Sequence, residues 1–146
     1  MRHATIADLS DIMKIFQKYR RIFPHIRSDA VKREIETGQV IFEDGVVITY
    51  GIYKRRQALG TCVAWRGDGH LGQIVNGEEG NGRAKAVLKK FFDFIRDRTN
   101  TVWLTVRRDN LRARDFYVRN GMTEVGEITW SGGTIEGCVY NIHLKG

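Results

Sequence analysis

The part of the sequence with the clearest chemical potential is a glycine-rich segment at residues 76–82, Asn-Gly-Glu-Glu-Gly-Asn-Gly, between two apolar stretches. Glycines before a helix leave backbone N–H groups open to an anion at the positive end of the helix dipole. Arg83, Lys85 and Lys89 follow the segment and add positive charge. The segment therefore predicts either a phosphate-binding loop or a loop that only caps a helix.

Two common nucleotide-binding motifs are incomplete in this segment. Gly77 and Gly82 have the spacing of a nucleoside-triphosphate loop, but an Arg-Ala pair follows where lysine and serine or threonine are required. Gly80 and Gly82 begin a dinucleotide fingerprint, yet Lys85 occupies the position of its last glycine. Neither motif assigns a ligand to the loop.

The secondary-structure elements around the loop are predicted from hydrophobic periodicity. Helical spacing predicts helices at residues 9–19, 28–37, 83–95 and 112–120, the first preceded by a capping box from Thr5 to Asp8. Runs of β-branched and aromatic residues predict strands at 2–6, 40–42, 46–53, 59–65, 71–75, 102–106, 122–130 and 137–144. We expect 59–65 and 71–75 to form a hairpin, and 71–75 to run parallel to 102–106. This order predicts an α/β (α+β) fold with a mixed sheet and helices on both faces.

Composition and charge restrict the class of protein. The chain has 146 residues, 42% of them hydrophobic, which predicts one globular domain spanning residues 1–146. It has no apolar run of membrane-spanning length and no secretory signal, so we expect a cytoplasmic protein without membrane contact. The histidines are scattered, and we expect no metal site. The net charge of +7 and the pI of about 9.7 favour an anionic partner, which could be a polyphosphorylated cofactor, a nucleic acid or an acidic protein.

Together with its flanks, the glycine-rich segment resembles the acetyl-CoA signature of the GNAT family of N-acetyltransferases. That signature has glutamine or arginine, two residues, glycine, one residue, and then glycine or alanine. In the matching frame, residues 79–84, Gly82 and Ala84 agree with the signature and Glu79 departs from it. A carboxylate at that position repels phosphate unless it points away. The resemblance implies that backbone amides hold the pyrophosphate, and the residues concerned are Gly80, Asn81, Gly82, Arg83 and Ala84.

A second match to the same family lies at residues 110–122. Asn110, Ala113, Phe116 and Tyr117 agree with its asparagine, alanine and phenylalanine-tyrosine series, and Met122 replaces an aromatic residue. Without the resemblance, the aromatic pair reads as ordinary core. With it, Asn110, Ala113 and Phe116 are expected to contact the pantetheine arm, and Tyr117 to protonate the departing thiolate.

The resemblance also implies a fold and a mechanism. The fold is GNAT-like, with a mostly antiparallel sheet splayed at its centre. In the reaction, a primary amine attacks the thioester of acetyl-CoA directly in a ternary complex. The backbone amides of Ile74 and Val75 are expected to hold the acetyl carbonyl. The strand before the loop carries no acid, so His70 is the candidate general base, against a plain role as a turn or surface histidine. Glu43, Asp44 or a chain of water molecules are the alternatives.

The acceptor is open at this level. A small-molecule or peptide amine is the principal hypothesis. The first alternative is an amine linked to a nucleic acid, and the second is a basic nucleic-acid-binding module without enzymatic activity. The alternatives rest on the pI and on the arginines at positions 107, 108, 112, 114 and 119. The identity of the acyl group and the formation of a homodimer are also open.

Overall fold

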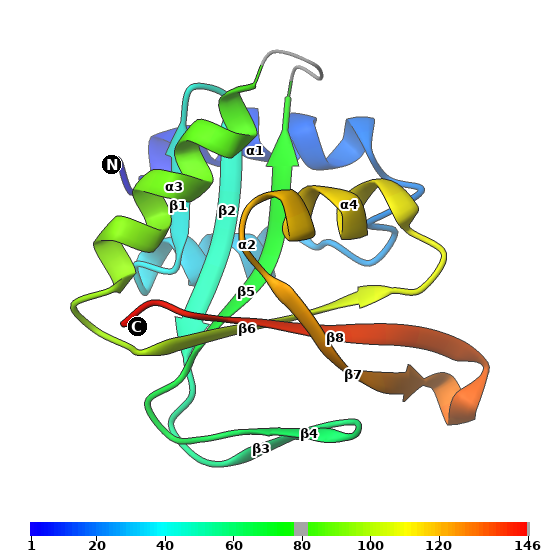
Figure 1. The fold of residues 1–146 in the computed structure, drawn as a ribbon. Coiled ribbons are helices and arrows are strands. Elements are labelled where there is room, and N and C mark those ends of the chain that lie inside the picture. The colour runs from blue at the N-terminus through cyan, green and yellow to red at the C-terminus, as the bar shows by residue number, and fades with distance from the viewer. Residues whose placement is uncertain (78–81, 146) are drawn as a thin grey trace. The chain divides into compact units, whose positions relative to one another are not determined.

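The structure is a computed structural model that describes residues 1–77 and 82–145. The helices are α1 (Leu9–Lys18), α2 (Ser28–Glu36), α3 (Arg83–Ile95) and α4 (Leu111–Arg119) (Figure 1). The strands are β1 (Val40–Glu43), β2 (Val46–Ile52), β3 (Gln57–Leu59), β4 (Cys62–Ala64), β5 (Gly69–Asn76), β6 (Thr101–Arg107), β7 (Thr123–Trp130) and β8 (Ile135–His143).

The sheet is mixed and mostly antiparallel. Its strand order is β1-β2-β5-β6-β8-β7, and β3 and β4 form a separate hairpin. The pairs β1–β2, β6–β8 and β7–β8 are antiparallel, whereas β5 and β6 are parallel. The chain divides into two compact units. The first unit contains Met1–Tyr50 and Gln73–Phe91, and the second contains Gly51–Gly72 and Phe92–Gly146.

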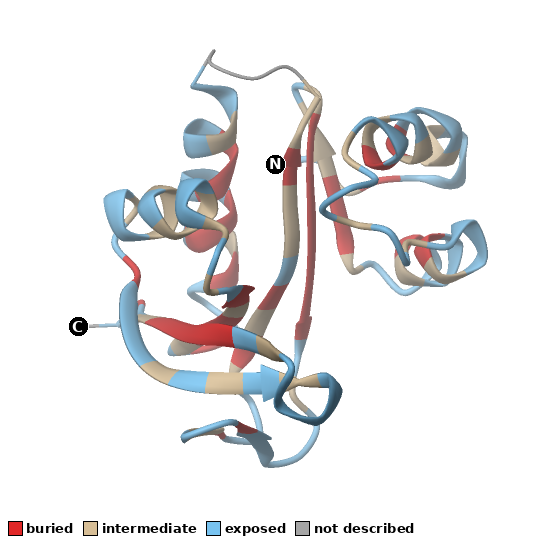
Figure 2. Cartoon of the chain, turned by 90° about the vertical axis from the view of Figure 1, so that its right-hand side faces the viewer, coloured by how far each residue is buried: buried red, intermediate tan, exposed pale blue. Residues whose placement is uncertain are grey.

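The first unit has a helix layer on each face of its strands (Figure 2). Strand residues alternate between faces, so Val40 and Val47 point to the side on which they pack with Ile12 of α1 and Val31 of α2. On the opposite face the ring of Tyr50 lies edge-on to Phe91 of α3, with 5.1 Å between centroids. The helical periodicity in the sequence is explained by these two apolar interfaces.

The second unit is built around β8. This strand pairs with β6 from His143 to Gly137, and with β7 on its other side. The β3–β4 hairpin docks onto β7, because Thr61 donates its backbone N–H to the carbonyl of Glu127 and accepts the N–H of Glu127 on its hydroxyl, both at 2.9 Å. A small apolar cluster beneath the hairpin includes Trp103 of β6.

Most predicted elements are confirmed, but two strand predictions were wrong. The segment 59–65 is not one strand paired with 71–75, because β3 turns at Gly60 and pairs with β4, with Leu59 opposite Cys62. Gly60 has φ +61, which suits the first central position of a two-residue hairpin turn. The predicted strand 2–6 is reduced to a single bridge between His3 and Ile41, since the chain turns at once into a 3₁₀ helix.

The capping box at the start of the chain is confirmed. The Asp8 carboxylate accepts the backbone N–H of Thr5 at 2.8 Å, and Asp8 donates its own N–H to the Thr5 carbonyl at 2.9 Å. Arg2 also donates to this carboxylate, and the pKa of Asp8 is lowered by the bond from Thr5 and then by Arg2. Within residues 1–77 and 82–145, no helix is long and apolar enough to span a bilayer.

Candidate functional site

The end of β5 leads into the glycine-rich segment. The parallel register joins Gly69 to Val102 and His70 to Trp103, and the described residues of β5 beyond His70 lie outside that register. Next to Ile74, the buried Thr49 hydroxyl of β2 accepts the backbone N–H of Gln73 at 2.8 Å and donates to its side-chain oxygen at 2.6 Å. A side chain of β2 therefore fixes the backbone of β5 immediately before Ile74 and Val75.

Ile74 and Val75, whose backbone amides are predicted to hold the acetyl carbonyl, differ in burial. Val75 is buried and packs in the apolar cluster of α1 and α2, whereas Ile74 is half-buried. Because side chains alternate along a strand, Ile74 points to the face opposite Val75. Both residues belong to β5, which continues to Asn76, and the role of their amides stays a prediction.

Gly82 directly precedes α3 and is the described residue of the loop nearest to that helix. Its carbonyl accepts the N–H of Ala86 at 3.3 Å, so Gly82 is the N-cap, and the N–H groups of Ala84 and Lys85 lie too close to the start of the helix to have an acceptor within it. Gly82 has φ +74, a left-handed conformation that favours glycine. These N–H groups lie at the positive end of a helix with 13 residues. Of the other predicted loop residues, Glu79, Gly80 and Asn81 lie outside the described residues.

Helix α4 carries the second set of predicted site residues. Asn110 is its N-cap, and the side-chain oxygen accepts the N–H of Ala113 at 3.2 Å. This bond uses the Ala113 amide for helix capping and holds the Asn110 side chain in a defined orientation. Among the described residues, none accepts a hydrogen bond from the Asn110 side-chain nitrogen, which is therefore available to a ligand.

Tyr117 is half-buried one turn after Ala113. Its ring lies edge-on to Phe116 at 5.8 Å and near Tyr140 at 6.1 Å between centroids. Burial of the phenol raises the pKa of Tyr117 to about 12, so the group is protonated at neutral pH. No described residue forms a hydrogen bond with its hydroxyl. Tyr117 is thus a protonated donor that the described chain leaves uncommitted.

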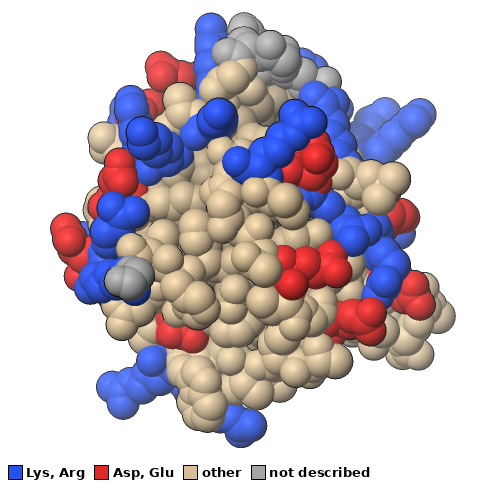
Figure 3. Space-filling view, viewed as in Figure 1, with Lys and Arg blue, Asp and Glu red and all other residues tan. Residues whose placement is uncertain are grey.

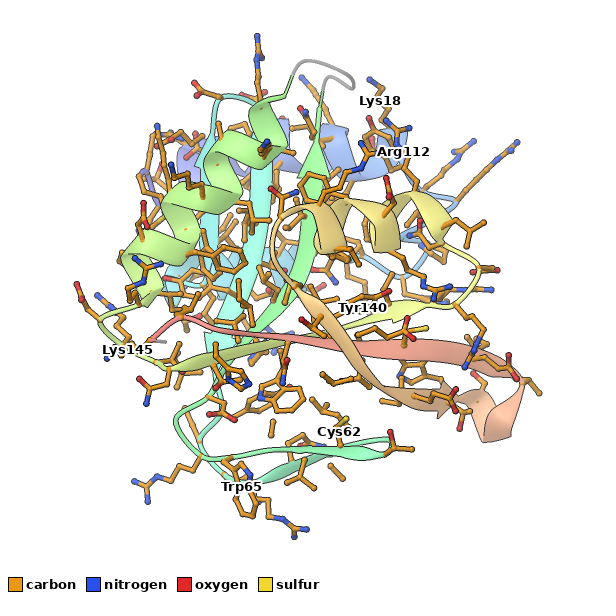
Figure 4. The ribbon with its side chains drawn as sticks, viewed as in Figure 1. Lys18, Cys62, Trp65, Arg112, Tyr140 and Lys145 are labelled. Atoms are coloured by element: carbon orange, nitrogen blue, oxygen red, sulfur yellow. The ribbon has the colours of Figure 1, made fainter. Side chains whose placement is uncertain are left out.

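A hydrogen-bonded cluster that sequence reasoning missed supports α4. Arg114 donates to the Tyr140 hydroxyl at 3.1 Å, to the Arg108 carbonyl at 2.9 Å and to the Glu124 carboxylate at 2.8 Å. The Tyr140 hydroxyl also donates to Glu124 at 3.1 Å, and the pKa of Glu124 is lowered by Arg114 and then by Tyr140. Tyr140 is labelled in Figure 4. The cluster ties α4 to β7 and β8, and its members carry no common sequence motif.

The candidate bases lie in different surroundings. The ring of His70 packs against Tyr53 with 4.8 Å between centroids, and burial lowers its pKa, which keeps the imidazole neutral at pH 7. In the first unit, Glu43 accepts a 2.7 Å hydrogen bond from Lys90, and this bond lowers the carboxyl pKa. Asp44 is exposed in the β1–β2 turn. A neutral imidazole can accept a proton from an amine, whereas the ion pair makes Glu43 a weaker base.

The arginines that supported a nucleic-acid interface are largely paired with acids. Figure 3 shows blue and red side chains interspersed over the visible face. The pairs within the second unit are Arg107–Asp109 at 3.4 Å, Arg108–Glu127 at 3.1 Å, Arg114–Glu124 at 2.8 Å and Arg119–Asp115 at 3.0 Å. These pairs reduce the positive charge that the four arginines present to a phosphate backbone.

The predicted site residues thus form two groups. Ile74, Val75 and the described loop residues from Gly82 belong to the first unit. The second unit holds His70 and the residues of α4, namely Asn110, Ala113, Phe116 and Tyr117. Sequence reasoning missed Thr49, and the only available signal for it was a polar residue inside an apolar strand.

Known structures share this architecture. A ribosomal-protein-alanine N-acetyltransferase from Brucella melitensis superposes with a TM-score of 0.72 at 16% identity, covering 97% of this chain and 98% of that chain. A candidate acetyltransferase from Salmonella typhimurium, solved with acetyl-CoA, gives a TM-score of 0.74 at 15% identity, covering 99% and 92%. The ribosomal-protein-S18-alanine N-acetyltransferase from Escherichia coli gives 0.70 at 16% identity, covering 97% and 91%. At these identities the likeness shows the fold alone.

Sequence comparison assigns the family. A search among curated proteins finds no match to this chain. The acetyltransferase (GNAT) family, by contrast, matches residues 9–122, a range that contains α1, the glycine-rich segment and α4. With this match over most of the chain and the fold described above, the protein belongs to the GNAT family of acetyltransferases.

Proposed function

We propose that this protein is an acetyl-CoA-dependent N-acetyltransferase that transfers an acetyl group to a primary amine. The observation that carries the proposal is the N-terminus of α3, where Gly82 caps the helix and the N–H groups of Ala84 and Lys85 follow without helical acceptors. Such a terminus suits a pyrophosphate. Family membership supports acetyl-CoA as the ligand that supplies it, and acetyl-CoA is the donor of the acyl group.

The chain's own residues have distinct tasks in this proposal. The first-turn amides of α3, with Gly80 and Asn81, hold the pyrophosphate, while Asn110 and Phe116 contact the pantetheine arm. The amides of Ile74 and Val75 hold the acetyl carbonyl, which stabilises negative charge on its oxygen. His70 accepts a proton from the attacking amine, and Tyr117 donates a hydrogen bond to the departing sulfur. Positioning of two reactants in one ternary complex supplies much of the rate.

The acceptor is proposed as a small-molecule or peptide amine. Some structural neighbours act on ribosomal-protein alanine, and another is a candidate phosphinothricin N-acetyltransferase, so the fold serves acceptors of very different size. The ion pairs around the arginines of the second unit argue against the nucleic-acid alternatives. The acceptor screen below includes transfer RNA, so that an amine linked to RNA is tested as the competing acceptor.

Calorimetric titration with acetyl-CoA, coenzyme A and ATP tests the donor site. We expect binding of both coenzyme A species, and weaker or no binding of ATP. An acceptor screen then measures release of free thiol with α-amino peptides, lysine peptides, polyamines and transfer RNA. Intersecting double-reciprocal plots are expected for a ternary complex. A folded protein that binds neither coenzyme A species would refute the proposal.

A further inference from the structure

The chain that enters the glycine-rich segment is fastened by residues to which sequence analysis gave no role. Tyr19, at the end of α1, donates its hydroxyl hydrogen to the Asn76 carbonyl at 2.9 Å. Lys18 donates to the Gly77 carbonyl at 2.9 Å, and Figure 4 labels this side chain. The backbone N–H of Gly77 is donated to the Gly45 carbonyl at 2.9 Å. All of these residues belong to the first unit.

One peptide group is held at both of its ends. The carbonyl of Asn76 and the N–H of Gly77 belong to the same planar trans peptide and point in opposite directions. Tyr19 bonds the carbonyl, and Gly45 in the β1–β2 turn bonds the N–H. Rotation of this peptide plane would break both bonds, so the direction in which the chain leaves β5 is fixed.

The same turn reaches the chain on the far side of residues 78–81. Arg83, the first residue of α3, donates to the Asp44 carbonyl at 3.4 Å, a longer and weaker bond than those at Gly77. Adjacent carbonyls of one turn, Asp44 and Gly45, therefore bond the residues on either side of that segment.

We propose that Tyr19 and Lys18 are positioning residues of the acyl-CoA site. This inference rests on the proposed function, because it assigns these residues to the binding of its donor. Backbone donors bind an anion well only if they are oriented before the ligand arrives, since any ordering on binding subtracts from the affinity. By fixing the Asn76–Gly77 peptide, α1 holds the end of β5, from which the chain passes into the glycine-rich segment.

The hydroxyl of Tyr19 can be removed with little change in packing. Tyr19→Phe keeps the ring, which packs against the apolar cluster of α1, α2 and β1. We expect the calorimetric Kd for coenzyme A to rise three- to tenfold, the equivalent of one net hydrogen bond. With the acceptor found in the amine screen, KM for acetyl-CoA should rise by the same factor while kcat at saturating acetyl-CoA is unchanged.

Tyr50→Phe is the matched control. Its hydroxyl donates to the Gly38 carbonyl at 3.0 Å and also bonds the His3 ring at 2.7 Å, so the same chemical change removes hydroxyl bonds in the same unit, but away from the end of β5. We expect its Kd for coenzyme A to stay within twofold of wild type, with a loss of melting temperature at least as large as that of Tyr19→Phe. Equal losses of affinity in both variants would overturn the assignment, because they would report only a general loss of stability.

Lysine substitutions test the second bond. Lys18→Met should weaken coenzyme A binding, and Lys18→Arg should restore most of it, since a guanidinium can donate to the same carbonyl. If the single variants Tyr19→Phe and Lys18→Met both bind coenzyme A with wild-type affinity, the proposal is overturned. A wild-type protein that binds no coenzyme A would instead overturn the proposed function, so the two failures are distinguishable.

Discussion

Removal of the Tyr117 hydroxyl should slow the chemical step and leave the free energy of unfolding almost unchanged. No described residue bonds this hydroxyl, so Tyr117→Phe sacrifices no hydrogen bond within the described chain. The ring keeps its edge-on contact with Phe116 and its position near Tyr140. We therefore expect the free energy of unfolding to change by less than about 0.5 kcal/mol, the usual range for a substitution that breaks no specific interaction.

The pKa of Tyr117 decides how large the catalytic effect can be. Transfer of a proton from a phenol with a pKa of about 12 to an alkyl thiolate with a pKa of about 8.5 is uphill by roughly 5 kcal/mol, at about 1.36 kcal/mol per unit. Tyr117 is therefore better suited to donate a hydrogen bond to the developing negative charge on sulfur than to surrender its proton. A hydrogen bond to a charged group contributes about 1.5–3 kcal/mol, so we expect the chemical step to slow about 10- to 100-fold.

Single-turnover kinetics with saturating acetyl-CoA and the acceptor found in the amine screen measure that step directly. Tyr140→Phe is the matched control for stability, because its hydroxyl bonds Arg114 and Glu124. That variant should lose about 1–3 kcal/mol of unfolding free energy. An unchanged chemical step in Tyr117→Phe would return Tyr117 to a core role. A stability loss as large as that of Tyr140→Phe would show that its hydroxyl has a partner after all.

Three further predictions follow from the site. Gly82→Glu should abolish coenzyme A binding, measured by calorimetry. Gly82→Gln bears the same left-handed backbone strain without the charge, so it should bind coenzyme A more tightly than Gly82→Glu. Equal affinities of the two variants would contradict anion binding at α3. Thr49→Val should lower the unfolding free energy in urea by about 1–3 kcal/mol, because the Gln73 N–H and side-chain oxygen both lose a partner; a loss below about 0.5 kcal/mol would show that the bonds are replaced. Because burial lowers the pKa of His70 below 6.5, the unfolded state binds more protons just below pH 6.5 and stability falls as the pH drops through that range. His70→Asn should remove this dependence in thermal melts at several pH values, and an unchanged dependence would mean that other groups cause it.

The sequence determined those features that depend on residues close together along the chain. Helical spacing located α1, α2 and α3, since each needs only one apolar stripe. The same holds for the capping box at Thr5 and for the Asn110 side chain, which caps the helix only three residues ahead. The family match over residues 9–122 agrees with the resemblance drawn from the glycine-rich segment and α4.

Tertiary structure decided the features whose partners are distant in sequence. Tyr19 bonds a carbonyl 57 positions away, and Lys18 bonds one 59 positions away. Sequence analysis named Arg114 only among the arginines that supported a nucleic-acid interface, yet it bonds Tyr140, 26 positions away. Pairing of the strand at 59–65 also depended on one glycine with positive φ, which selected a tight hairpin over a longer strand. A hydrogen bond between distant residues leaves no periodic pattern, because its donor and acceptor meet only after the sheet and helices have packed.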